Sequence, residues 1–206
     1  MPVEDVLYPV SLVVTGKRCV VVGGGSVAAR KTRALVAAGA DVLVIAPEIC
    51  EEIKGLPVKV AERPYRRGDL SAAWLALAAT DNPSVNRQVF ADGQDVRVWV
   101  NVADDPGACS FTLPAVMRRG PVTVAVSTSG YSPALAGWIR EQIAADVGPE
   151  VALLAELLAE ARDALKASGR STEDVDWRRA LDSDMLELIR TGQTAQARER
   201  LQACLS

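Results

Sequence analysis

The chain has 206 residues, of which 49% are hydrophobic and 24% are charged, a composition typical of a globular domain with an extension. The formal net charge of −3 argues against nucleic-acid binding, which requires a basic surface. No apolar run approaches the roughly 20 residues that a membrane span requires. The N-terminus has no basic stretch followed by an apolar run, so we expect a cytoplasmic protein.

The sequence contains no histidine, which restricts its chemistry. A general base must be a carboxylate, Lys, Tyr, Cys or the substrate itself, and Ser-His-Asp triads are excluded. The cysteines are far apart and form no C-x-x-C pair, which favours reduced thiols over disulfides or a metal site. We therefore expect no metal site in the chain. The cysteines are Cys19, Cys50, Cys109 and Cys204.

Short apolar runs alternate with helical patterns in the first half of the chain. The continuous run Arg18–Val22 is typical of a parallel strand that is buried on both faces. Strands that alternate with helices imply βαβ crossovers, so this half predicts a parallel sheet. The expected strands are residues 18–22, 41–45, 58–61, 75–78 and 96–100, and the expected helices are residues 26–38 and 83–93.

The pattern changes near residue 104, where Asp-Asp-Pro-Gly is typical of a turn. Beyond Ser132-Pro133, which suits a helix start, the chain is expected to be helical nearly to its end. Apolar residues between Val151 and Leu165 recur at steps of three and four, and they predict one apolar helix face. Two further strands are expected, at residues 110–113 and 121–127.

A glycine-rich motif connects the first strand to the first helix. Gly23-x-Gly25-x-x-Ala28 has the G-x-G-x-x-G/A form of a dinucleotide-binding fingerprint, with Ser26 and Val27 inside it. The first glycine permits a tight turn, the second lets a pyrophosphate approach the backbone, and the small third residue lets helix and strand pack closely. A simple turn would need similar glycines, but the position between strand and helix favours dinucleotide binding.

The ribose of the dinucleotide has a less distinct partner in the sequence. The fingerprint places an acidic residue about 20 positions on, at the tip of the second strand, where Pro47 and Glu48 stand. Glu48 either reaches a ribose 2′-hydroxyl or lies in solvent, and NAD is favoured over NADP. Arg30, Lys31 and Arg33 in the first helix either face a phosphate or form a solvated face.

Polar residues follow the fourth and fifth strands, at the edge where ligands of open α/β sheets bind. Thr80 and Asp81 are placed to contact the cofactor, although Asp81 could instead cap the helix that follows. Asp104 and Asp105 form either a solvated turn or a carboxylate site at the cofactor edge. In a histidine-free chain, a carboxylate there is the leading candidate for proton transfer, because partial burial can raise its pKa.

Residues 124–133 (V-A-V-S-T-S-G-Y-S-P) run from a strand into a hydroxyl-rich turn that can offer hydroxyl and backbone N–H groups to an anion. Together with V-V-G-G-G-S-V-A-A-R-K, A-A-T-D-N-P-S-V-N and N-V-A-D-D-P-G-A-C-S-F-T-L-P-A, this segment resembles the precorrin-2 dehydrogenase / sirohydrochlorin ferrochelatase family, the N-terminal module of siroheme synthases. The resemblance covers roughly residues 7–145 in collinear order, which makes it far more specific than the glycine motif alone.

The resemblance implies an α/β fold with a Rossmann-type parallel-sheet domain over residues 1–112. A small α+β dimerisation region over residues 113–147 and a helical C-terminal domain over residues 148–206 follow it. A homodimer is implied, with an interface that helps to form the active site. The methyltransferase module of trifunctional relatives has no counterpart in these residues, so we expect another enzyme to supply the substrate.

The resemblance also implies the NAD⁺-dependent oxidation of precorrin-2 to sirohydrochlorin, and it leaves open the insertion of Fe²⁺ as a second reaction. Asp104 matches the family's catalytic aspartate by motif position. Thr128 stands where some relatives carry Ser, so no serine role is transferred to it. The expected substrate-binding residues are Asn101, Ser127, Thr128, Ser129 and Gly130, with Arg118, Arg119 and Arg140 as cationic partners of the substrate carboxylates.

Two other functions fit parts of the sequence. A non-catalytic NAD-sensing module would need the glycine motif but not the N-V-A-D-D-P or S-T-S-G-Y-S-P segments. An oxidoreductase acting on another small metabolite would need the cofactor and a compact pocket. A sensor would bind NAD without a tetrapyrrole, whereas the enzyme must bind both.

Overall fold

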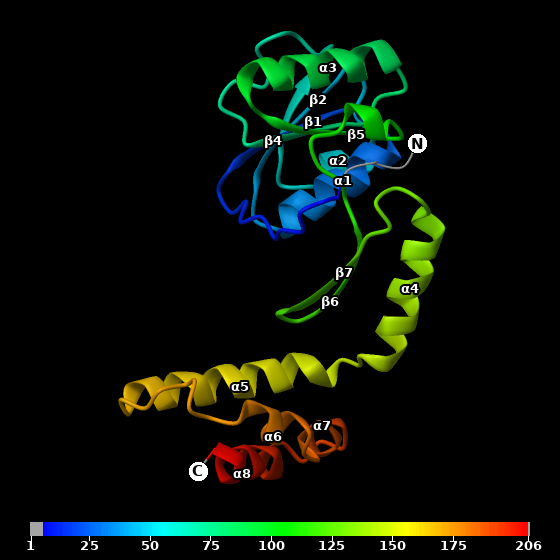
Figure 1. Cartoon of the computed structure of the whole chain (residues 1–206). Helices are drawn as coiled ribbons and strands as arrows, with labels where there is room; N and C mark the ends of the chain where they lie inside the picture. Colours follow the sequence, from blue (N-terminus) through cyan, green and yellow to red (C-terminus); the bar gives the residue numbers. More distant parts are fainter. Residues whose placement is uncertain (1–5, 206) are drawn as a thin grey trace. The chain divides into compact units, whose positions relative to one another are not determined.

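The computed structural model describes residues 6–205, which form two compact units (Figure 1). The first unit runs to Leu113 and also includes Ser129–Ser132. The second unit contains Pro114–Thr128 and the chain from Pro133 onward. Each unit has a hydrophobic core of its own. Across residues 6–205, no helix combines the length and the apolar character needed to cross a membrane.

The first unit contains a five-stranded parallel sheet in the order β3-β2-β1-β4-β5. After β3 the chain crosses to the other side of β1, so the strand order reverses between β1 and β4. Such a reversal is the topological switch point at which open α/β sheets bind their ligands. The strands are β1 (Arg18–Val22), β2 (Asp41–Ala46), β3 (Lys59–Glu62), β4 (Leu75–Ala78) and β5 (Trp99–Val102).

Helices cover both faces of this sheet (Figure 1). Cys19 and Val21 of β1 pack in the core on the side of α1 and α2, whereas Val20 and Val22 pack in the core on the side of α3. All four side chains are at most 2% exposed, which confirms the prediction of a strand buried on both faces. The Rossmann-type α/β fold is therefore confirmed. The helices are α1 (Ser26–Ala37), α2 (Glu51–Lys54) and α3 (Pro83–Val96).

The predicted boundary between α3 and β5 is wrong, because β5 begins at Trp99 rather than at Val96. The helix continues past Gly93, where the missing side chain lets α3 lie close to β5. A Cβ on Gly93 would clash with the side chain of Val100. Arg97 ends the helix in the left-handed region, at φ 59°. This glycine serves helix–strand packing, not helix termination.

The strand predicted at residues 110–113 is also wrong. This segment is irregular and follows a 3-10 turn at Pro106–Ala108. The N–H of Ser110 donates to the carbonyl of Val100 at 2.7 Å, and the N–H of Val100 donates to Oγ of Ser110 at 3.3 Å. A serine hydroxyl thus takes the place of a backbone partner, and no continuous ladder forms.

The second unit begins with an antiparallel hairpin of β6 (Ala115–Arg119) and β7 (Val122–Val126). β7 confirms the strand predicted at residues 121–127. Gly120 lies in the two-residue turn with φ 54°, a conformation that tight hairpin turns require. The first helix after the hairpin, α4 (Pro133–Asp146), packs against both strands.

The rest of the second unit is helical, as predicted. Most of the expected apolar face of α5 joins its core: Leu165 is buried, and Leu154, Leu158 and Ala161 pack partly buried against later helices. Leu157, which lies outside the expected face, is also buried in this core. The apolar face therefore packs within the chain. The remaining helices are α5 (Glu150–Ala167), α6 (Trp177–Leu181), α7 (Met185–Arg190) and α8 (Thr194–Leu205).

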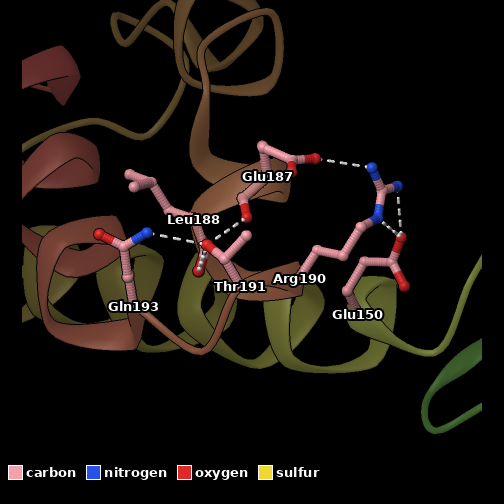
Figure 2. A network of polar contacts seen from close by, with 6 residues as sticks. All are labelled: Glu150, Glu187, Leu188, Arg190, Thr191 and Gln193. Carbon is pink, nitrogen blue, oxygen red and sulfur yellow. Dashed lines mark hydrogen bonds and ion pairs between the residues drawn. The ribbon is translucent and has the colours of Figure 1, made fainter.

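Arg190 links α7 to the start of α5 (Figure 2). Its Nη2 donates to Oε1 of Glu150 at 2.6 Å, and its Nη1 donates to Oε2 of Glu187 at 2.7 Å. The pKa of the Glu150 carboxyl is lowered, first by a backbone hydrogen bond and then by Arg190. This network fixes the end of α7 on α5 within the helical part.

Candidate active site

The carboxyl ends of β2, β1, β4 and β5 meet along one edge of the sheet. Val22 is the register partner of both Ile45 and Ala78, and Ala78 is the partner of Val102. The loops that follow these strands therefore lie side by side. These loops carry the predicted cofactor residues and Asp104. Residues from motifs that are far apart in the sequence therefore lie along one edge of the sheet.

The glycine motif lies between two neighbouring loops. Gly23 has φ 132°, and its N–H donates to the carbonyl of Ile45 at 2.9 Å. A Cβ on Gly23 would clash with the carbonyl of Ala79, and a Cβ on Gly24 would clash with the carbonyl of Glu48. The fingerprint leaves the middle position free, so sequence reasoning missed the need for Gly24. The run of three glycines was the available signal.

The N-terminus of α1 fits a bound pyrophosphate. Gly25 is the N-cap and offers no side-chain acceptor, and the first turn has no acidic residue. A Cβ on Gly25 would stand in open space. Ser26 and Val27 are exposed at this end, whereas Ala28 is buried against the sheet. The backbone N–H groups of this turn and the positive end of the helix dipole can therefore hold the phosphates of a dinucleotide.

Pro47 and Glu48 follow β2, and both are exposed. The carbonyl of Glu48 lies against Gly24, and the N–H of Cys50 donates to the carbonyl of Gly24 at 2.9 Å. These contacts hold the loop beside the glycine motif. The Glu48 side chain is thus on the loop where the fingerprint expects a partner for the ribose.

Hydrogen bonds to a buried asparagine fix the loop after β4. Asn86 lies on α3, and its Oδ1 accepts from the hydroxyl of Thr80 at 2.8 Å and from the N–H of Thr80 at 3.2 Å. Its Nδ2 donates to the carbonyl of Thr80 at 2.9 Å. Asp81 is exposed and does not cap α3. The N-cap is Asn82, whose side chain accepts from the N–H of Ser84 at 2.9 Å. Sequence reasoning missed Asn86, whose signal is a polar residue on the inward side of a helix.

Asp104 lies in the turn after β5. Its φ of 59° is left-handed, a conformation that aspartate adopts more readily than most residues but that still costs about 1 kcal/mol. The carboxylates of Asp104 and Asp105 are both exposed. The N–H of Ala103 donates to the carbonyl of Ala78 at 2.8 Å, so the sheet pairing extends up to this turn.

A polar cluster of Lys31, Asn101 and Cys109 lies at the end of β5. Nζ of Lys31 donates to Oδ1 of Asn101 at 2.9 Å, and Nδ2 of Asn101 donates to the carbonyl of Phe111 at 3.0 Å. The sulfur of Cys109 accepts from the N–H of Val102 at 3.2 Å. Asn101 is only 7% exposed, and its side chain bonds within the protein.

The charges of this cluster act on one another. Burial lowers the pKa of Lys31 and the charge of Arg30 lowers it further, whereas Cys109 and Asp104 raise it. Burial raises the pKa of the Cys109 thiol, against the hydrogen bond from Val102 and the charge of Lys31. The Lys31 ammonium is therefore within electrostatic range of Asp104.

The predicted cationic substrate partners have different surroundings. Nη2 of Arg119, in β6, lies 3.5 Å from the carbonyl of Ala144 near the end of α4, so this side chain links two elements of its unit. Arg118 is exposed on β6. Arg140 on α4 forms an ion pair with Glu141 at 2.7 Å.

The predicted hydroxyl turn follows β7. Ser127 and Thr128 belong to the second unit, and Ser129 and Gly130 belong to the first. Ser129 and Gly130 both have left-handed backbones, with φ of 49° and 80°. Within residues 6–205 the structure gathers no group of three Cys, Asp or Glu side chains that could hold a metal ion.

The parallel sheet, its glycine motif and the open helix end define a dinucleotide-binding protein of the Rossmann type. The model of a family described as putative NAD(P)-binding matches residues 10–115, and a model described as sirohaem biosynthesis protein, central, matches residues 119–145. The chain belongs to the precorrin-2 dehydrogenase / sirohydrochlorin ferrochelatase family, which includes the N-terminal modules of siroheme synthases. The predicted NAD-type cofactor is thereby confirmed.

Similar proteins support this assignment. The siroheme synthase of Nitrosococcus oceani is 36% identical over 204 residues, which are 96% of this chain and 43% of that protein. The siroheme synthase of Pseudomonas entomophila is 39% identical over 197 residues, covering 91% and 42%. A solved structure of SirC, precorrin-2 dehydrogenase, has a TM-score of 0.69 and 26% identity, and covers 96% of this chain and 98% of its own. The chain thus spans less than half the length of these siroheme synthases.

Proposed function

We propose that this chain oxidises precorrin-2 to sirohydrochlorin with NAD⁺. One observation carries the proposal: the uncapped N-terminus of α1 and the Asp104 turn lie on the same edge of one sheet. This edge therefore combines a phosphate-binding site with a carboxylate. The similarity to a precorrin-2 dehydrogenase structure over nearly the whole chain supports a tetrapyrrole substrate.

The oxidation removes one hydride and one proton from precorrin-2. When bound, the nicotinamide supplies the hydride acceptor, so that NAD⁺ becomes NADH. The first turn of α1 holds the pyrophosphate, and the loops that carry Glu48 and Thr80 flank it on either side. Asp104 takes the proton: it is one of two adjacent carboxylates after β5, and it is the one that matches the family's catalytic aspartate by motif position.

Substrate recognition is proposed for groups that suit a polycarboxylate. Arg118 is exposed on β6 and can form forked hydrogen bonds to a carboxylate. The Ser127–Gly130 turn supplies hydroxyl and backbone N–H groups. Asn101 is included because it matches the family pattern, and Arg119 because it is a cation. Each has a partner within its own unit: Asn101 bonds to Lys31 and Arg119 to the carbonyl of Ala144.

We propose that residues 113–147 form the interface of a homodimer. A two-stranded sheet is marginal by itself; α4 packs against this one but leaves Val116 exposed. Val116 on β6 is 41% exposed and Trp138 on α4 is 58% exposed, an apolar area that a second copy would cover. Residues 1–112 would then bind the dinucleotide, and residues 148–206 would form the helical domain.

We also propose that the reaction takes place in the cytoplasm. All four cysteines are free in the structure, which fits a reducing compartment. Insertion of Fe²⁺ into sirohydrochlorin is a second reaction of the same family, and it would need a base for the two pyrrole protons that the metal displaces. Asp104 could serve this step as well, so the assay below includes Fe²⁺.

The adjacent carboxylates supply a matched pair of variants for the test. Asp104→Asn should lower the rate of NADH formation from precorrin-2 and NAD⁺ on the order of 100-fold or more, as loss of a general base does. Asp105→Asn should remain close to the wild-type rate, and both variants should bind NADH like the wild type. The assignment of Asp104 as the base fails if the two variants behave alike. Addition of Fe²⁺ to the product then measures chelation against the uncatalysed rate.

A further inference from the structure

One basic side chain of α1 departs from the others in its contacts. Arg33 is exposed and pairs with Glu52 of α2 at 2.9 Å, the arrangement of a solvated helix face. Lys31 is half-buried, and its Nζ lies 2.9 Å from Oδ1 of Asn101, 70 residues further along the chain. Lys31 thus joins the helix that carries the phosphate site to the end of β5.

The hydrogen bonds of Asn101 determine which way its amide faces. A lysine ammonium has only donors, so the atom beside it must be the amide oxygen. The amide nitrogen then faces the carbonyl of Phe111, to which it donates at 3.0 Å. Lys31 therefore fixes the orientation of a buried side chain three positions before Asp104. Without Lys31, the oxygen of this amide would lose its partner in a buried position.

The amide of Asn101 also contacts the segment that follows the Asp104 turn. Nδ2 of Asn101 lies 3.5 Å from the sulfur of Cys109, which accepts from the N–H of Val102 at 3.2 Å. Asp104 lies between Asn101 and Cys109 in the chain, so this amide contacts the chain on the far side of the turn that carries the proposed base.

We propose that Lys31 is a positioning residue for the oxidation: it holds the amide of Asn101 at the end of β5, so that the dinucleotide-binding helix and the turn that carries the base keep a fixed relation. This inference rests on the proposed function and assigns a further residue to it. Lys31 acts through Asn101 and Asp104 and has no covalent part in the reaction. A shift of the turn by even a fraction of an ångström would misplace the base against the bound substrate.

Two substitutions separate the hydrogen bond of Lys31 from its bulk. Lys31→Met removes the donor to Oδ1 of Asn101, whereas Lys31→Arg keeps a donor at this position.

The experiment compares the full-length wild type with Lys31→Met, Lys31→Arg and the control Arg33→Met. The measured quantities are NADH formation from precorrin-2 and NAD⁺, kcat and KM for each substrate, and NADH binding by fluorescence. For Lys31→Met we expect kcat to fall on the order of ten-fold, with KM for NAD⁺ and NADH binding changed less than about twofold. Lys31→Arg should recover most of the rate, and Arg33→Met should match the wild type.

Three results would overturn the inference. If Lys31→Met weakened NADH binding with kcat unchanged, Lys31 would be a phosphate ligand. If Lys31→Arg lost as much rate as Lys31→Met, the hydrogen bond to Asn101 would not be what Lys31 contributes. If the wild type formed no NADH, the proposed function itself would fail. A loss of rate confined to the Lys31 variants would leave the proposed function in place, so the two failures can be told apart. Should Lys31→Met fail to fold by circular dichroism, Lys31→Leu, which also lacks the donor, takes its place.

Discussion

Two helices of the first unit begin at the same edge of the sheet, and their first turns are treated differently. α3 starts with Asn82, whose side chain accepts from the N–H groups of Ser84 and Val85, followed by Pro83, which has no N–H. α1 starts with Gly25, which has no side-chain acceptor. The orphan donors of α3 are thus satisfied within the protein, whereas those of α1 are left to a ligand.

This difference separates stability from binding. A side-chain cap is worth about 1 kcal/mol relative to Ala but only a few tenths relative to Gly, so the absence of a cap at Gly25 is a small cost that the free protein carries. The neighbouring positions are constrained by close contacts, since Gly23 and Gly24 each face a carbonyl oxygen, while Gly25 faces open space. The loop is therefore shaped by its neighbours everywhere except at the position that a phosphate would approach.

The largest effect on NADH binding is expected when α1 is given the side-chain cap that it lacks. Gly25→Asp places a carboxylate at the N-cap, and like charges a few ångströms apart should weaken NADH binding on the order of 100-fold or more. The fold should be as stable as the wild type or a few tenths of a kcal/mol more so, because the cap satisfies orphan donors. Fluorescence titration and thermal melting measure the two effects. Gly25→Ser adds an acceptor without the charge and should weaken binding less; an unchanged affinity in both variants would contradict the placement of the phosphates.

A second variant tests the loop after β4, which lies beside the glycine motif. Asn86→Ala removes three hydrogen bonds from Thr80 and takes this partner from its partly buried N–H, at a cost of about 2 kcal/mol in the free energy of unfolding. NADH binding should weaken several-fold, because the loop beside the glycine motif loses its support. Asn86→Asp retains both acceptor contacts and should fall between the wild type and Asn86→Ala in denaturant melts. Equal stability of all three proteins would show that this contact does not fix the loop.

The smallest effect is expected when the cap of α3 is removed. Asn82→Ala should lower stability by about 1 kcal/mol, or about 2–4 °C in melting temperature for a chain of this size. NADH affinity should stay within about twofold of the wild type, in contrast to Gly25→Asp. If Asn82→Ala weakened NADH binding as much as the Gly25 variant, the two helix ends would share one role and the distinction drawn between them would be wrong.

Much of the fold could be predicted because the relevant signals are local. Buried apolar runs place β1 and β4 at the predicted residues, and the glycine motif marks the start of α1. The errors arise where a residue responds to a distant neighbour. Gly93 lies inside α3 because Val100 packs against it, which its immediate sequence does not reveal. The strand predicted at residues 110–113 failed because β5 pairs with that segment partly through the hydroxyl of Ser110.

The candidate site divides in the same way. The glycine motif and the Asp104 turn were found from short patterns that carry their own chemistry. Asn86 and the contact between Lys31 and Asn101 were not, since a hydrogen bond across 70 residues has no local signature. The basic residues of α1 look equivalent in the sequence, and the contacts alone distinguish Lys31 from Arg33.

The most direct test of the central claim is the anaerobic reaction of the wild-type chain with precorrin-2 and NAD⁺, followed by the absorbance of NADH and of sirohydrochlorin. The account predicts that one NADH forms for each sirohydrochlorin, at a rate proportional to the protein concentration. Binding of NAD⁺ with no NADH formed from precorrin-2 would contradict it. The chain would then be a dinucleotide-binding module that senses NAD or acts on another substrate.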